Sequence, residues 1–89
     1  MREENAAATV DGNALAGLLA GVFEGDATML VGVCAGCGAA AALAETIVEI
    51  DDTCAIARCR TCTHTLLTVL QDDESVRVVF GMLRELRRV

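Results

Sequence analysis

The chain has 89 residues, no lysine, and a formal net charge of −6 that arises from 13 acidic residues against 7 arginines. This length fits one small domain, in which a hydrophobic core alone supplies little net stability. The acidic charge disfavours binding to a phosphate backbone, and an aromatic content of only 2% disfavours stacking on nucleic-acid bases.

The first ten residues are polar and rich in alanine. We expect them to form a flexible N-terminal tail, followed by a single domain over residues 11–89. The opening stretch Met1-Arg2-Glu3-Glu4-Asn5 lacks an apolar segment after a basic start, so it does not resemble a secretory signal. We therefore expect a cytoplasmic protein whose thiols are reduced.

Residues 11–25 carry the pattern of an amphipathic helix. Asp11-Gly12-Asn13 offers capping side chains at its start. Apolar residues then recur at helical spacing, namely Leu15, Leu18, Leu19, Val22 and Phe23. The pattern predicts a helix of about three turns that ends near Gly25 and covers one side of a sheet.

Residues 27–44 contain no charged side chain, and this stretch of 18 residues approaches the length of a membrane-spanning helix. Gly32, Gly36 and Gly38 interrupt it, however, and it is rich in alanine. Its apolarity is too weak for insertion into a bilayer. We expect a strand, a tight turn and a second strand here, and no membrane segment.

The rest of the chain alternates in the way that is typical of strands. We expect strands at residues 29–33, 46–50, 54–58, 65–70 and 76–80, with turns at Asp51-Asp52-Thr53 and at residues 71–75. The spacing of Met82, Leu83 and Leu86 fits a short C-terminal helix, and an extension of the last strand fits nearly as well.

Two cysteine pairs are the most informative feature of the sequence: Cys34-Ala-Gly-Cys37 and Cys59-Arg-Thr-Cys62, with 21 residues between them. Each pair, with the residue after it, forms what we call the first knuckle (residues 34–38) and the second knuckle (residues 59–63). One such turn can present two thiolates to an ion, and two turns side by side complete a tetrahedral sulfur site. The spacing predicts one Zn²⁺ per chain, bound by Cys34, Cys37, Cys59 and Cys62.

Other interpretations of the four cysteines exist. Two disulfides would suit a secreted chain, and a thioredoxin-like redox motif would use one pair and leave the other unexplained. A rubredoxin-like iron site uses the same four sulfurs, so iron stays an alternative to zinc. Gly38 follows the first pair, where a turn often needs positive φ, whereas Thr63 holds that place in the second knuckle.

Cys54 and His64 lie near the pairs and could also take part in chemistry. Cys54 could replace a ligand, but four ligands are already present, so we interpret it as a small buried apolar residue. His64 could coordinate a metal or titrate near neutral pH, and we interpret it instead as a surface group beside the site. Neither residue has the nucleophile and base pairing of a hydrolase.

The cysteine pairs resemble those of zinc-ribbon proteins. Together with Asp11-Gly12-Asn13-Ala14, the apolar segment after it and the arginine-rich end, they resemble a small bacterial zinc-ribbon family of unknown function. The resemblance covers residues 11–89 and implies a small α+β fold. In this fold, an N-terminal amphipathic helix packs on an antiparallel zinc-ribbon β-sheet, with a possible short C-terminal helix.

Three functions fit these expectations. The first is a structural-zinc module that binds another protein as an accessory to it. We expect no catalytic activity, because four cysteines close the coordination sphere. The second is an iron electron carrier, and the third is a nucleic-acid-binding ribbon that uses Arg58, Arg60 and the C-terminal arginines. Composition disfavours the second and charge disfavours the third. High apolar content also makes a homodimer plausible.

Overall fold

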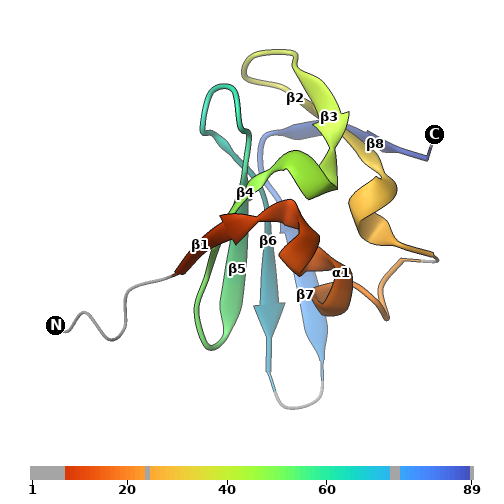
Figure 1. Cartoon of the computed structure of the whole chain (residues 1–89), viewed down its shortest axis with the longest axis vertical. Helices are drawn as coiled ribbons and strands as arrows, with labels where there is room; N and C mark the ends of the chain where they lie inside the picture. The colour runs from red at the N-terminus through yellow and green to blue at the C-terminus, as the bar shows by residue number, and fades with distance from the viewer. Residues whose placement is uncertain (1–7, 24, 73–74, 89) are drawn as a thin grey trace, which may run out of the picture.

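A computed structural model describes residues 8–23, 25–72 and 75–88, which form two antiparallel sheets (Figure 1). The larger sheet has five strands in the order β1 (Ala8–Asp11), β4 (Ile47–Ile50), β5 (Cys54–Arg58), β6 (Thr65–Gln71) and β7 (Val76–Phe80). The smaller sheet has three strands in the order β3 (Ala40–Ala42), β2 (Val31–Cys34) and β8 (Leu83–Arg87).

Four short helical segments connect or flank the strands. They are η2 (Gly12–Ala14), α1 (Leu15–Leu18), η3 (Ala27–Met29) and η4 (Leu43–Glu45). The Asp11 and Asp26 carboxylates accept hydrogen bonds from Asn13 N and Thr28 N, and so satisfy free amides at the starts of η2 and η3. No helix among the described residues is long and apolar enough to cross a membrane.

The core lies between one face of the five-stranded sheet and the helical segments. Alternate residues of β4, β5 and β6 point into it, because side chains on a strand alternate between its two faces. The buried members of this core are Leu15, Leu19, Ala27, Leu30, Leu43, Val48, Ala55, Ala57, Leu67 and Val69. All are aliphatic, as the composition requires.

The prediction of an N-terminal amphipathic helix packed on the sheet is wrong. The chain forms only η2 and the single turn α1, and its backbone leaves the helical conformation at Leu19. Gly17 and Gly21 lie in this run, and each glycine disfavours a helix by about 1 kcal/mol relative to alanine. Leu15 and Leu19 are nonetheless fully buried. The spacing of the apolar residues therefore indicates which side chains contact the core, and it does not indicate a continuous helix.

Of the two possibilities left open for the C-terminal segment, the helix is wrong and the chain is extended. Leu83–Arg87 is strand β8, which pairs with β2 and places Leu86 opposite Gly32. Without β8, the backbone groups on that side of β2 would lack strand partners, and burying such groups is costly. The expected single ribbon sheet is likewise replaced by two sheets, with the first knuckle after β2 and the second knuckle after β5.

Several expected strands are confirmed. β4, β5, β6 and β7 overlap the expected ranges 46–50, 54–58, 65–70 and 76–80, and β2 is shifted to Val31–Cys34. Asp51 makes the expected turn by accepting bonds from Thr53 N and Cys54 N. Residues 1–7 of the expected tail lie outside the described residues, and residues 8–10 belong to β1.

Gly12 provides a test of how the segment after β1 packs on η4. A Cβ atom at position 12 would lie 1.7 Å from the carbonyl oxygen of Leu43, so the backbone would have to move. We expect Gly12→Ala to lower the free energy of unfolding by about 3 kcal/mol. Gly17→Ala is the matched control, because a Cβ there meets nothing within 4 Å, and it should raise stability by about 0.5–1 kcal/mol. Thermal unfolding followed by circular dichroism measures both, and equal effects would contradict this packing.

Candidate metal centre

The first knuckle joins β2 to β3. Cys34 N donates to the carbonyl oxygen of Ala39 at 2.9 Å, and Gly38 N donates to that of Cys34 at 2.7 Å, which closes the turn. Gly38 has φ of +79°, a conformation in which a side chain would be strained. Gly36 N lies 3.3 Å from the Cys34 sulfur and donates to it, as expected of a turn whose amides support a thiolate.

The second knuckle joins β5 to β6 and repeats these bonds at equivalent positions. Cys59 N donates to the carbonyl oxygen of His64 at 2.9 Å, and Thr63 N donates to that of Cys59 at 2.8 Å. Thr63 takes the place of Gly38 with φ of +67°, and it is the only non-glycine residue with positive φ in the described part of the chain. The second knuckle therefore reaches the same geometry as the first, but with a strained β-branched residue.

The fold brings together the sulfurs of all four predicted ligands, Cys34, Cys37, Cys59 and Cys62, within 4.8 Å of one another. Two of the separations between the knuckles are 3.5 Å, from Cys34 to Cys62, and 3.6 Å, from Cys37 to Cys59. Sulfurs that surround one zinc ion at about 2.3 Å lie about 3.8 Å apart in a tetrahedron. The four sulfurs therefore fit a metal ion. All five cysteines belong to the described residues, and all five are free thiols.

Each knuckle contributes one buried sulfur and one that is closer to solvent. Cys34 is 1% exposed and Cys59 is 5% exposed, whereas Cys62 is half-buried and Cys37 is exposed. Leu66, with Ala39 and Leu83 beside it, packs against the buried pair in a small apolar cluster separate from the main core. The two outer sulfurs thus lie on the solvent side of the site.

The crowding of four thiols separates their pKa values. Burial alone would raise the pKa of Cys59, but backbone N–H groups of Cys62 and Thr61 oppose it, and the pKa falls to about 7. For Cys62, a backbone hydrogen bond at His64 lowers the pKa, but burial and the other three cysteines raise it more, to about 12. One thiol of the cluster therefore ionises readily, and its negative charge disfavours ionisation of the neighbouring thiols. A bound cation would be needed for all four cysteines to be thiolates.

His64 lies beside the site, as expected of a surface group there. It is exposed, and its Nδ1 lies 3.0 Å from the Cys62 sulfur. Its ring also lies against Gly36 of the first knuckle, where a Cβ would come within 2.8 Å of Nδ1. The ring therefore contacts both knuckles and can donate a hydrogen bond to the Cys62 sulfur. The sequence did not indicate this contact, because it depends on how the two turns face each other.

Cys54 does not join the four-sulfur cluster. It is half-buried at the start of β5, and its thiol lies 3.8 Å from the Asp51 carboxylate. Burial and this negative charge raise the pKa of Cys54, so the thiol stays neutral. Cys54 begins β5, whereas the second knuckle follows the other end of this strand, so Cys54 lies away from the cluster.

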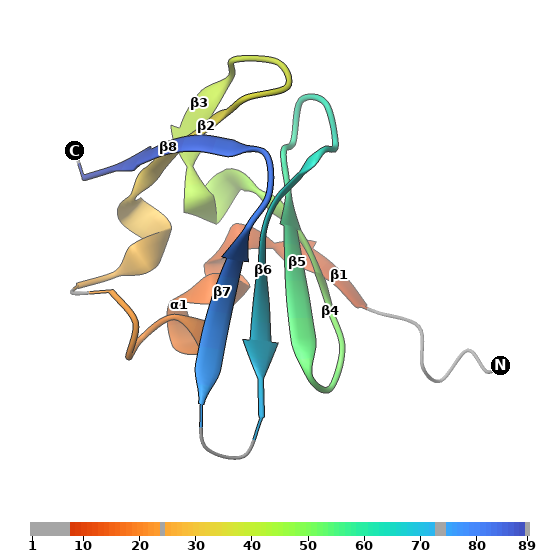
Figure 2. The same ribbon diagram turned by 180° about the vertical axis from the view of Figure 1, so that it is seen from behind.

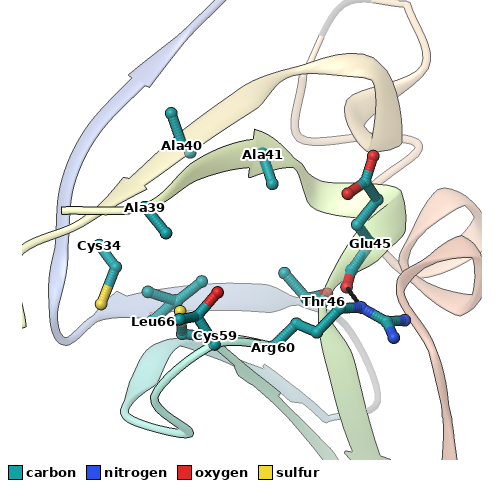
Figure 3. Close-up of a pocket in the computed structure, with 11 residues that line it drawn as sticks. Cys34, Ala39, Ala40, Ala41, Glu45, Thr46, Cys59, Arg60 and Leu66 are labelled. Atoms are coloured by element: carbon teal, nitrogen blue, oxygen red, sulfur yellow. Dashed lines mark hydrogen bonds between the residues drawn. The ribbon is translucent and has the colours of Figure 1, made fainter. Parts of the chain in front are cut away.

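Arg58 and Arg60 flank Cys59 but make bonds elsewhere. Arg58 pairs with Glu49 at 3.0 Å and donates to Thr65 Oγ1 at 3.1 Å, across β4, β5 and β6. Arg60 Nε donates to the carbonyl oxygen of Glu45 at 2.8 Å, which ties the second knuckle to η4. A pocket between these segments has Cys34 and Cys59 at one end and Arg60 with Glu45 at the other (Figure 3).

Comparison with known proteins places this chain in a family. A family model described as "Family of unknown function (DUF6510)" matches residues 4–88. The chain belongs to this family. The match spans both knuckles of the DUF6510 chain, and it confirms the expected membership in a family of unknown function. No curated protein and no solved structure matches the chain.

Thr63 allows a test of strain in the second knuckle. We expect Thr63→Gly to raise stability by about 1 kcal/mol, because relief of the left-handed conformation exceeds the entropic cost of glycine. Thr61→Gly is the control, since Thr61 has ordinary φ, and it should lower stability by about 1 kcal/mol. Thermal unfolding of the metal-loaded protein measures both. Destabilisation of similar size by both substitutions would contradict the strain.

Proposed function

We propose that the DUF6510 chain is a non-catalytic domain in which one Zn²⁺ fixes two sheets together and so supports a surface for protein contact. The observation that carries this proposal is the set of four sulfurs within 4.8 Å of one another, supplied by a hairpin of each sheet. An ion bound there would link β2 and β3 to β5 and β6. These strands are far apart in the sequence, so the link would stabilise contacts of long range.

A structural role fits the number and type of ligands. Four cysteine sulfurs fill the tetrahedral sphere that zinc prefers and leave no position for water or substrate. The chain is small and its core is aliphatic, so the free energy of metal binding would be a large part of its folding free energy. The same ligands also accept iron, and the metal content of the purified protein separates the two metals.

A role in protein contact is supported by the exposed apolar side chains of β7. Val79 is 50% exposed and Phe80 is 55% exposed, and Val76 on the same strand is also exposed. These side chains lie on both faces of an edge strand, and large exposed apolar groups mark contact sites in soluble proteins. The net charge of −6 argues against nucleic acid as the partner.

The metal proposal is tested by Cys37→Ser with Cys54→Ser as its matched control. Cys37 belongs to the sulfur cluster and is exposed, so this change removes a ligand without disturbing the core. Because structural zinc binds with about 10–16 kcal/mol over four ligands, losing one should weaken zinc binding by about 100-fold. Cys54→Ser should keep wild-type affinity, since Cys54 lies outside the cluster.

Competition with a chromophoric chelator measures the affinities, and elemental analysis of protein purified without added metal gives the metal content. About one zinc per chain supports the proposal, whereas one iron per chain favours the electron carrier. Folded wild-type protein without metal would refute a structural ion, as would equal affinities of the Cys37→Ser and Cys54→Ser variants.

A further inference from the structure

β7 forms an edge of the five-stranded sheet, and its outer side faces no other strand among the described residues (Figure 2). Four of its five residues are exposed, and only Val78 is half-buried, against the core. The strand reads Val-Arg-Val-Val-Phe, with no proline, glycine or bulge within it. Such an edge is a template for another strand, and proteins usually protect it.

The hydrogen bonds at both ends of β7 show which of its backbone groups are free. Asp72 N donates to Ser75 O, and Gly81 N donates to Leu66 O, so positions 75 and 81 bond toward β6. In an antiparallel pair such positions alternate. Arg77 and Val79 therefore bond to β6, and the N–H and C=O groups of Val76, Val78 and Phe80 point away from the sheet.

We propose that β7 pairs with β7 of a second copy of this chain, antiparallel about a two-fold axis at Val78, so that the two sheets become one. In this register Val78 lies opposite its own copy, and Val76 lies opposite Phe80 of the second copy. All three outward positions then form hydrogen-bonded pairs. The Val76 and Phe80 side chains meet across the junction as an aromatic and β-branched pair, which is favourable in sheets.

Charge and hydrogen bonding select this register and this partner. In it Arg77 lies opposite Val79 of the second copy, on the outer face of the sheet. A two-fold axis at Arg77 would place the two arginines opposite each other, which is unfavourable, and would lose one hydrogen-bonded pair. An axis at Val79 also forms only two hydrogen-bonded pairs, because Val76 then has no partner in β7 of the second copy. The strand is therefore complementary to itself in one register, which favours a second copy over an unrelated chain.

This pairing deepens the proposed function, on whose protein-contact role it rests, by naming the partner. It uses residues of β7, which share no residue with the knuckles. Metal content and self-association can therefore be measured separately on the same sample.

The test changes the charge at position 79 of the metal-loaded protein. Val79 is exposed on the outer face, so its replacement should leave the fold of one copy intact. Val79→Arg places an arginine opposite Arg77 twice in the dimer and should raise the dimer dissociation constant about tenfold. Val79→Glu places a carboxylate opposite Arg77 and should lower the dimer dissociation constant about tenfold. Sedimentation equilibrium at low ionic strength measures both.

The charge-swapped variant Arg77→Glu/Val79→Arg is the control for the register, and it should dimerise at least as tightly as the wild type. Amide hydrogen exchange gives a second readout. Protection of the Val76, Val78 and Phe80 amides should increase with protein concentration, whereas that of Arg77 and Val79 should not.

A wild-type protein with full metal content that stays monomeric at all concentrations would overturn the dimer and leave the metal proposal intact. A dimer whose dissociation constant changes in the same direction and by the same factor with Val79→Arg and Val79→Glu would overturn the β7 pairing. Protein that dimerises as described but carries no metal would refute only the structural ion.

Discussion

The contact between the two sheets depends on the electrostatic interaction of four cysteine sulfurs with one another and with a bound cation. The sulfurs come from hairpins of two different sheets, and two of the separations between these hairpins are 3.5 and 3.6 Å. Thiolates at this distance repel each other, and the repulsion acts between the sheets. A divalent cation at the centre reverses the sign, because each sulfur is then drawn to the ion. The same side chains can therefore separate the two halves of the molecule or hold them together.

The proximity of the four paired cysteines follows most directly from the sequence. A cysteine pair two residues apart places both sulfurs on one turn, and the intervening strands need only bring two turns together. The repeated bonds of the knuckles, from Cys34 N to Ala39 O and from Cys59 N to His64 O, follow from this local geometry. Alternation also predicts β4 to β7, because one face of each strand meets an aliphatic core.

Local residue patterns do not predict how short the N-terminal helical segments are, or that β8 pairs with β2. Leu15 and Leu19 have helical spacing, but glycines at 17 and 21 weaken the helix, and packing holds only one α-helical turn. Leu83 and Leu86 also have helical spacing, yet β2 needs a partner strand, and this need outweighs a weak local preference. The division of the strands into two sheets depends on such long-range pairing, which residue spacing does not encode.

The uneven burial of the sulfurs has a consequence for metal exchange. Cys34 and Cys59 lie under apolar side chains, while Cys37 and Cys62 are closer to solvent. An incoming ion would meet the outer sulfurs first, and a competing donor molecule would detach them first. Binding and release of the ion would thus follow the same route, and the bonds from Cys34 and Cys59 would be the last to break. Oxidants in solution would likewise reach Cys37 and Cys62 before Cys34 and Cys59.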